Sequence, residues 1–270
     1  MTTATVTFRL TGPQQAWSTR ERSSTRPTQD HPTKSGVIGL VANALGRDRT
    51  DDINDLRALR LGVRADRAGR IESDFHTSGS GSFPLLPSEV LSDPALARAA
   101  SKGAPLERTY SAPKNIDRDS KGSLVAKRTS AILTTDEYLC DADFTIALSG
   151  PRELVDRIAR ALTDPARSLH LGRRAYPLSA PPGPTVHSVD DPTAALDLVP
   201  PRHSQAQHLL WTEVHPTRRP HPDTEIVIDQ PTRFDSRRNA GRLEKRHISL
   251  PSSAAPASSA IDFFAPEEHP

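Results

Sequence analysis

Cysteine is almost absent from this chain of 270 residues, and aromatic residues are scarce. Cys140 is the single cysteine, so the chain forms no internal disulfide and has no thiol cluster for structural zinc. Aromatic residues make up 4% of the chain, so we expect a core built from Leu, Val, Ile and Ala. No apolar run approaches the roughly 18 residues that cross a membrane, and the N-terminus shows no signal-peptide pattern. We therefore expect a cytoplasmic protein without a membrane span.

Common catalytic and metal-binding motifs are missing as well. The sequence contains no GxSxG, no HExxH and no paired carboxylate motif. Its 10 histidines include two close pairs, His203 with His208 and His215 with His221, but neither pair has the spacing of zinc ligands. We predict no bound metal and no cofactor.

Proline and segregated charge are what the chain has in excess. There are 25 prolines, which predict long irregular loops. Basic residues gather in 1–70, 101–135 and 231–251, whereas 185–230 is acidic. Two interpretations fit this pattern: one basic face for an anionic partner, or an ordinary solvated surface.

Hydrophobic periodicity predicts an α+β fold. Period-2 alternation indicates strands, and 3.6-residue periodicity indicates amphipathic helices. Strands are predicted at 5–10, 61–66, 144–148, 209–214 and 225–228, and helices at 37–45 and 152–163. This order matches a ferredoxin-like, split βαβ core with an irregular C-terminal elaboration.

The domain organisation is predicted as one domain with a long insertion. We expect a single domain over 1–250, an insertion over about 76–137 and a disordered tail over 251–270. Within the insertion, a Gly/Ser/Pro-rich stretch carries a short helix near 93–100. The segment 125–135 is predicted to form one arm of an extended hairpin.

The stretch HPTKSGVIGLVANALGR, residues 31–47, places hydroxyl groups and a lysine at the start of a helix. Thr33 or Ser35 can cap this helix, and free backbone N–H groups at a helix N-terminus attract anions. Lys34 lacks the upstream glycines of a P-loop. With the preceding arginines and Trp17, the stretch suits a single-stranded nucleic acid. A simple helix cap beside a solvated loop fits equally well.

Two further basic stretches admit a functional and a structural interpretation. In LHLGRRAYPLSAPP, residues 169–182, a glycine allows a tight turn from which two arginines project. A surface turn with an arginine paired to an acid is the alternative. The stretch 107–130 is either a basic ribbon that follows a nucleic-acid backbone or a disordered charged loop.

Several of these stretches together resemble one known family. LTGPQQAW, TRPTQDHPTKSGVIGLVANALG, GVRADR, DFHT, YLCDADFTIALSG and LGRRAYPLSAPP occur in this order between residue 8 and about residue 182. They closely resemble the CasD subunits of type I-E CRISPR Cascade complexes, which form the Cas-five family of RAMP-type proteins. A weaker similarity lies at PTRFDSRRN, residues 231–239.

The resemblance implies a ferredoxin-like RNA-recognition core with a protruding β-hairpin thumb. Family members bind the 5′ handle of the CRISPR RNA and contact the large subunit CasA and the first CasC backbone subunit. In type I-E systems a separate subunit, CasE, cuts the precursor RNA. The resemblance therefore implies a non-catalytic subunit for antiviral defence, whose target DNA is reached only through the complex.

The matching motifs also imply which residues contact RNA. They contribute Gln15, Trp17, Arg26, Thr28, Lys34, Ser35, Gly36, His76, Arg173 and Arg174. The predicted thumb contributes Arg108, Tyr110, Lys127 and Arg128.

Two other functions remain open at this stage. Type I-C relatives cut RNA themselves, and a metal-independent endoribonuclease needs a base and a cation that His76, Tyr110 and Lys34 could supply. The other possibility is a single-strand binder that acts alone and has no preference for the handle.

Overall fold

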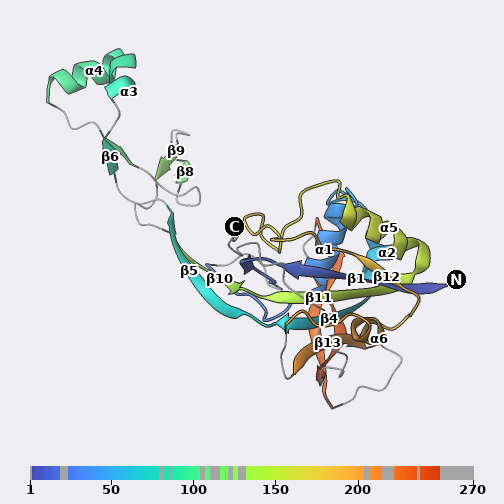
Figure 1. The fold of residues 1–270 in the computed structure, drawn as a ribbon. Helices are drawn as coiled ribbons and strands as arrows, with labels where there is room; N and C mark the ends of the chain where they lie inside the picture. The colour runs from blue at the N-terminus through green and yellow to red at the C-terminus, as the bar shows by residue number, and fades with distance from the viewer. Residues whose placement is uncertain are drawn as a thin grey trace, which may run out of the picture. The chain divides into compact units, whose positions relative to one another are not determined.

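The structure is a computed structural model of the chain, and it is described here over most of the sequence. The described residues are 2–18, 24–78, 82–84, 87–103, 107–109, 116–118, 120, 124–126, 132–203, 207–214, 222–235 and 238–249. They form a mixed α+β fold (Figure 1). Among them no helix is long and apolar enough to cross a membrane.

The chain divides into two compact units. The first unit comprises Met1–Glu21, Pro27–Glu72 and Tyr138–Pro270, and the second comprises Arg22–Arg26 and Ser73–Glu137. The predicted tail, 251–270, lies outside the described residues.

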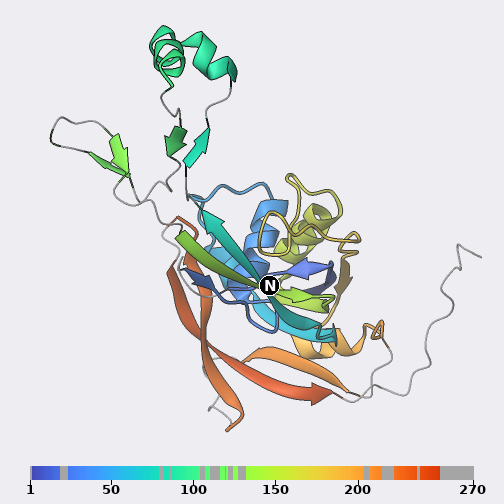
Figure 2. The same cartoon turned by 90° about the vertical axis from the view of Figure 1, so that its left-hand side faces the viewer.

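A seven-stranded sheet forms the frame of the first unit. Its strand order is β12-β1-β11-β4-β13-β15-β14, and every pair of neighbours is antiparallel. The strands are β12 (Thr185–His187), β1 (Thr3–Thr11), β11 (Asp143–Pro151), β4 (Arg60–Arg67), β13 (His208–Val214), β15 (Arg238–Ser249) and β14 (Thr224–Arg233). Figure 2 shows β14 and β15, coloured orange to red, at one end of this sheet.

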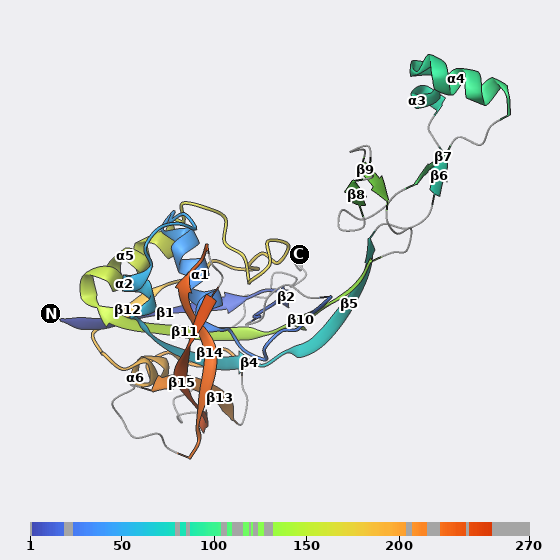
Figure 3. The ribbon, with the colours of Figure 1, turned by 180° about the vertical axis from the view of Figure 1, so that it is seen from behind.

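Helices cover both faces of the sheet (Figures 1 and 3). On β1, Val6, Phe8 and Leu10 point into the main core, which they share with α1 (Lys34–Ala44), α2 (Asn54–Arg57) and α5 (Arg152–Thr163). The short helix α6 (Pro192–Asp197) packs on the opposite face, where Leu196 and Leu210 form a smaller cluster. The alternation predicted from sequence is therefore confirmed on β1.

The second unit contains small local pairings. Strand β6 (Ser82–Pro84) pairs with β7 (Glu107–Thr109), and β8 (Ile116–Arg118) pairs with β9 (Leu124–Ala126). Helix α3 (Pro87–Ser92) precedes α4 (Pro94–Ser101), whose N-cap Asp93 accepts a hydrogen bond from the Ala95 N–H, so the short helix predicted near 93–100 is confirmed. Strands β5 (Arg70–Ser78) and β10 (Ile132–Cys140) pair with each other and contribute residues to both units. A role as a thumb stays a prediction.

Trp17 joins segments that are distant in the sequence. The side chain is 1% exposed, and its ring lies against the first turn of α1, at Gly36. A Cβ atom added to Gly36 would lie 2.7 Å from the Trp17 ring carbon Cε3. Gly39, one turn further along α1, has room, because an added Cβ would only reach Phe234 at 3.9 Å.

These two glycines give a matched test of the packing. Gly39→Ala should raise the free energy of unfolding by about 0.5–1 kcal/mol, because alanine favours the helix and meets an ordinary contact. Gly36→Ala should lower it by about 1–2 kcal/mol, because overpacking against a buried ring outweighs the same helical gain. Chemical unfolding of both variants measures the difference. Equal effects at the two positions would contradict the close packing of Trp17.

Candidate nucleic-acid interface

Gln15, Trp17 and Thr28 form an internal hydrogen-bonded group. The Gln15 amide accepts a hydrogen bond from the Trp17 indole N–H at 3.1 Å and donates one to the Ala142 carbonyl at 2.8 Å. The Trp17 backbone N–H donates to the Thr28 hydroxyl at 2.9 Å. All three side chains are buried, so the expectation that Trp17 stacks on a base is corrected. Its function here is to hold the QQAW and PTKSG segments together.

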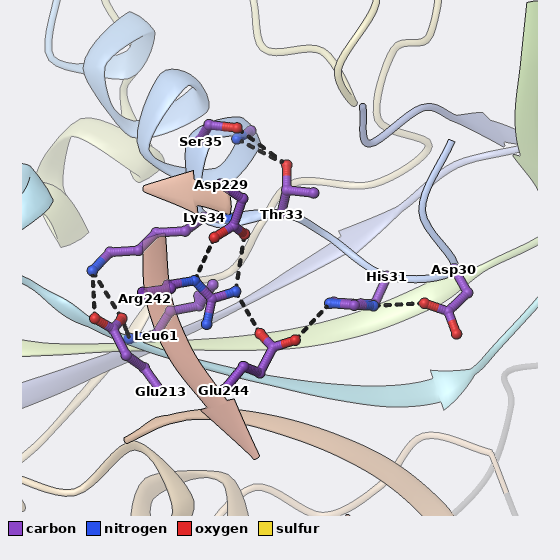
Figure 4. Close-up of polar contacts among 11 residues, drawn as sticks. Asp30, His31, Thr33, Lys34, Ser35, Leu61, Glu213, Asp229, Arg242 and Glu244 are labelled. Atoms are coloured by element: carbon purple, nitrogen blue, oxygen red, sulfur yellow. Dashed lines mark hydrogen bonds and ion pairs between the residues drawn. The ribbon is translucent and has the colours of Figure 1, made fainter. Parts of the chain in front are cut away.

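Lys34 is also buried, which corrects its predicted place at a phosphate. The side chain is 1% exposed, and its ammonium donates to both carboxylate oxygens of Glu213 at 2.8 Å (Figure 4). Glu213 in turn accepts from the Leu61 backbone N–H at 3.2 Å. Burial lowers the pKa of Lys34, and the Glu213 carboxylate opposes this effect. The ammonium therefore belongs to a buried ion pair.

The anion at the N-terminus of α1 is a carboxylate of the same chain. Thr33 caps the helix and accepts from the Gly36 N–H at 3.3 Å, as predicted, with Ser35 half-buried beside it. The Lys34 backbone N–H donates to the Asp229 carboxylate at 2.7 Å. Asp229 lies on β14 and is fully buried. The N-terminus of α1 attracts an anion, as the sequence predicts, but that anion is the Asp229 carboxylate of β14.

A chain of buried charges continues from Asp229 along β15. The Arg242 guanidinium donates to Asp229 at 2.6 and 2.9 Å and also contacts Glu244. The Glu244 carboxylate lies 3.3 Å from His31 Nε2, and His31 Nδ1 lies 2.6 Å from Asp30 (Figure 4). We call this group the α1 charge cluster; its members are Asp30, His31, Lys34, Glu213, Asp229, Arg242 and Glu244. It connects the helix entry to the strands β13, β14 and β15.

The α1 charge cluster perturbs the acid–base chemistry of His31. Desolvation alone would lower the pKa of His31, but the contacts with Asp30 and Glu244 outweigh it and raise that pKa. Burial alone would raise the pKa of Glu244, but His31 and Arg242 lower it. The His31 ring also stacks on Trp211 with a centroid distance of 4.3 Å. The cluster is thus most stable with His31 protonated.

Sequence reasoning missed the acidic half of this cluster. Glu213, Asp229 and Glu244 come from strands more than 170 residues from the helix entry in sequence. The available signal was the alternation of charged residues at Arg242 and Glu244 within an otherwise strand-like stretch. Within the basic segment 231–251 this pattern fits a basic face or a solvated surface equally well, and neither interpretation buries the charges.

The LGRR stretch forms a tight turn with exposed arginines. Arg174 is exposed and Arg173 is partly exposed. Gly172 adopts φ +84°, and a Cβ atom at this position would lie 1.8 Å from the Ala16 carbonyl oxygen, so only glycine fits. The Ala16 N–H donates to the Leu171 carbonyl at 3.1 Å. The turn is therefore fixed against the QQAW segment, which brings two of the motifs that carry the family resemblance together.

Two predicted residues of the second unit lie together beside an acid. Arg26 donates to Asp136 at 3.2 Å, and the His76 Nε2 lies 3.4 Å from Asp74 and 3.9 Å from Asp136. Arg26 and His76 are exposed. Arg108 lies in β7, but its side chain is outside the described part of the structure. Tyr110, Lys127 and Arg128 lie wholly outside the described residues. Their predicted RNA contacts stay predictions.

Metal ligation finds no support in the described part of the chain. No group of three or more His, Cys, Asp or Glu residues among these residues could hold a metal ion. The closest histidine–carboxylate contact outside the α1 charge cluster joins His203 and Asp143 at 2.9 Å, and Arg9 also binds this carboxylate.

The raised pKa of His31 predicts a stability change on the alkaline side. The folded-state pKa lies above the unfolded value of about 6.5. The stabilisation is therefore complete below that value and is lost as pH rises through the folded-state pKa. Unfolding free energies from pH 6 to 9 should fall in the wild type and change less in His31→Gln. His187 provides the control, because burial lowers the pKa of its imidazole. His187→Gln should therefore reduce the fall in unfolding free energy at acidic pH and leave the alkaline fall as in the wild type. An unchanged alkaline slope in His31→Gln would contradict the cluster.

Comparison with known proteins gives the family. The family model described as "CRISPR-associated protein (Cas_Cas5)" matches residues 5–246. The protein "CRISPR system Cascade subunit CasD" of Escherichia coli (strain K12) is 32% identical over 192 residues, which is 70% of this chain and 74% of that protein.

Solved structures agree with this match. A chain of a "CRISPR RNA-guided surveillance complex" has a TM-score of 0.65 and 28% identity, with 92% of both chains covered. A "Crystal structure of Cas protein" has a TM-score of 0.56 and 31% identity, with 92% of this chain and 95% of that one covered. The chain belongs to the Cas5 family of CRISPR-associated proteins.

Proposed function

We propose that the chain is the RNA-binding subunit of a type I-E Cascade surveillance complex. In this proposal it holds the 5′ handle of the CRISPR RNA, contacts the CasA and CasC subunits and works in the cytoplasm. The family match and the relative named as a Cascade subunit support the complex. The observation that carries the RNA contact is the Gly172-Arg173-Arg174 turn, which presents two guanidinium groups on a rigid support.

The strand order supports a ferredoxin-like core for this protein. In chain order, with other elements between them, β1, α1, β4, β11, α5 and β12 give the series strand, helix, strand, strand, helix, strand. The four strands lie side by side in the order β12-β1-β11-β4. The C-terminal strands β13, β15 and β14 extend this core at the β4 edge.

We further propose that the subunit does not cut RNA. The alternative, an endoribonuclease, would use Lys34 as the cation that stabilises the developing charge. The Lys34 ammonium donates to Glu213 and is 1% exposed, so it would have to leave a buried ion pair to reach a phosphate. His76, the proposed base, lies near Asp74 and Asp136, and the nearby cation Arg26 donates to Asp136 and is therefore already paired with a carboxylate.

The double variant Arg173→Ala with Arg174→Ala tests the proposal. It should weaken binding of a single-stranded RNA that carries the repeat-derived 5′ handle, because two cations at the RNA are lost. The slope of log affinity against log salt should become shallower by about 0.7 for each phosphate that the two arginines neutralise. Titration at several salt concentrations, by fluorescence anisotropy, measures both quantities.

The variant Arg157→Ala with Arg160→Ala is the charge-matched control, because both arginines are exposed on α5. It should leave the salt slope unchanged. Equal loss of affinity in both variants would indicate non-specific charge attraction and would contradict the proposed site. Cleavage of repeat RNA by the wild type in chelator would contradict the non-catalytic assignment.

A further inference from the structure

Two tyrosines lie beside the LGRR turn, and no predicted function includes them. Tyr138 is at the first-unit end of β10, and Tyr176 follows the two arginines in the turn. Their ring centroids are 6.0 Å apart, and the ring planes are tilted by 52°. Both side chains are partly exposed. The two partly exposed residues therefore form a small aromatic surface.

A guanidinium group extends this aromatic surface. The Arg173 Cζ atom lies 5.6 Å from the centroid of the Tyr176 ring, and its Nη1 donates to the Tyr176 hydroxyl at 3.0 Å. The hydrogen bond holds the guanidinium beside the ring, and the next residue, Arg174, is exposed. The Arg173 guanidinium therefore lies at the tyrosine pair, and Arg174 supplies a second cation from the next position in the chain.

The backbone fixes this arrangement before any ligand binds. The Leu171 N–H donates to the Tyr176 carbonyl at 2.7 Å, and the Tyr176 N–H donates to the Arg173 carbonyl at 3.0 Å. On the other side, β10 pairs with β2 (Gln14–Gln15), with Leu139 opposite Gln15. The strand that carries Tyr138 and the Gly172 turn are thus both hydrogen-bonded to the segment 14–16. A preformed surface loses little conformational entropy when it binds.

We propose that Tyr138, Tyr176 and the Arg173 guanidinium form a stacking platform for one unpaired nucleobase, with Arg174 at the adjoining phosphate. The inference rests on the proposed RNA-binding function and specifies how it is achieved. Proteins bind single strands by combining aromatic faces for bases with cations for the backbone. Every base has a π face, so the platform should select an unpaired nucleotide by position and not by base identity.

RNA-binding measurements on the full chain test the platform. The double variant Tyr138→Leu with Tyr176→Leu should bind the handle RNA about 5- to 150-fold more weakly, with an unchanged salt slope, because no charge is removed. Tyr176→Phe keeps the ring but loses the hydrogen bond to Arg173, so it should weaken binding less than the double leucine variant does. In a series of RNAs that each lack one base, a single abasic position should weaken binding to the wild type but not to the double variant.

The outcomes separate the platform from the proposed function. If the tyrosine variant binds as the wild type does while the Arg173/Arg174 variant is weakened, the platform is overturned and RNA binding at the turn stands. If neither variant changes binding, the proposed RNA site itself fails. If the leucine variant does not fold, the abasic series on the wild type still decides, because the absence of any sensitive position overturns the platform.

Discussion

The carboxylate of Asp229 at the N-terminus of α1 is the interaction on which the rest of the structure depends. A helix N-terminus carries free N–H groups and a positive partial charge, so a buried one needs hydrogen-bond acceptors and favours an anion. Asp229 meets that need from β14, and Arg242 neutralises it from β15. The helix entry is thereby joined to the C-terminal strands. A segment that looks like a ligand site from sequence is in fact an internal joint.

This joint leaves the proposed RNA contacts to the elements around it. The PTKSG entry packs on Trp17, Trp17 bonds to Gln15, and the segment that contains them supports the Gly172 turn. Lys34 and Trp17 are buried, so their side chains are not presented to RNA, while the segment that contains Trp17 fixes the turn of Arg173 and Arg174. In this account, rigidity of the buried motifs is what positions the exposed ones.

The sequence predicted those parts of the fold whose inward positions are apolar. The helix 152–163 was predicted at its observed bounds, and the strands at 5–10 and 144–148 follow from Val6, Phe8 and Phe144. Strand β15 was missed because Arg242 and Glu244 occupy buried positions that pattern reading assigns to apolar residues. The pairing of Lys34 with Glu213 could not be predicted either, since the two are distant in sequence. Charge alone does not tell a buried pair from a surface ligand.

Chemical unfolding of Lys34→Met, alone and combined with Glu213→Gln, most directly tests the central claim that the helix entry is an internal joint and not a ligand site. Glutamine keeps an acceptor for the Leu61 N–H, so the second change removes mainly the charge. Lys34→Met alone should lower the free energy of unfolding by about 3–5 kcal/mol, because it leaves a carboxylate without its cation, and adding Glu213→Gln should recover part of that loss. The contrary result is a Lys34→Met variant that is as stable as the wild type but binds handle RNA more weakly, which would place Lys34 at the RNA.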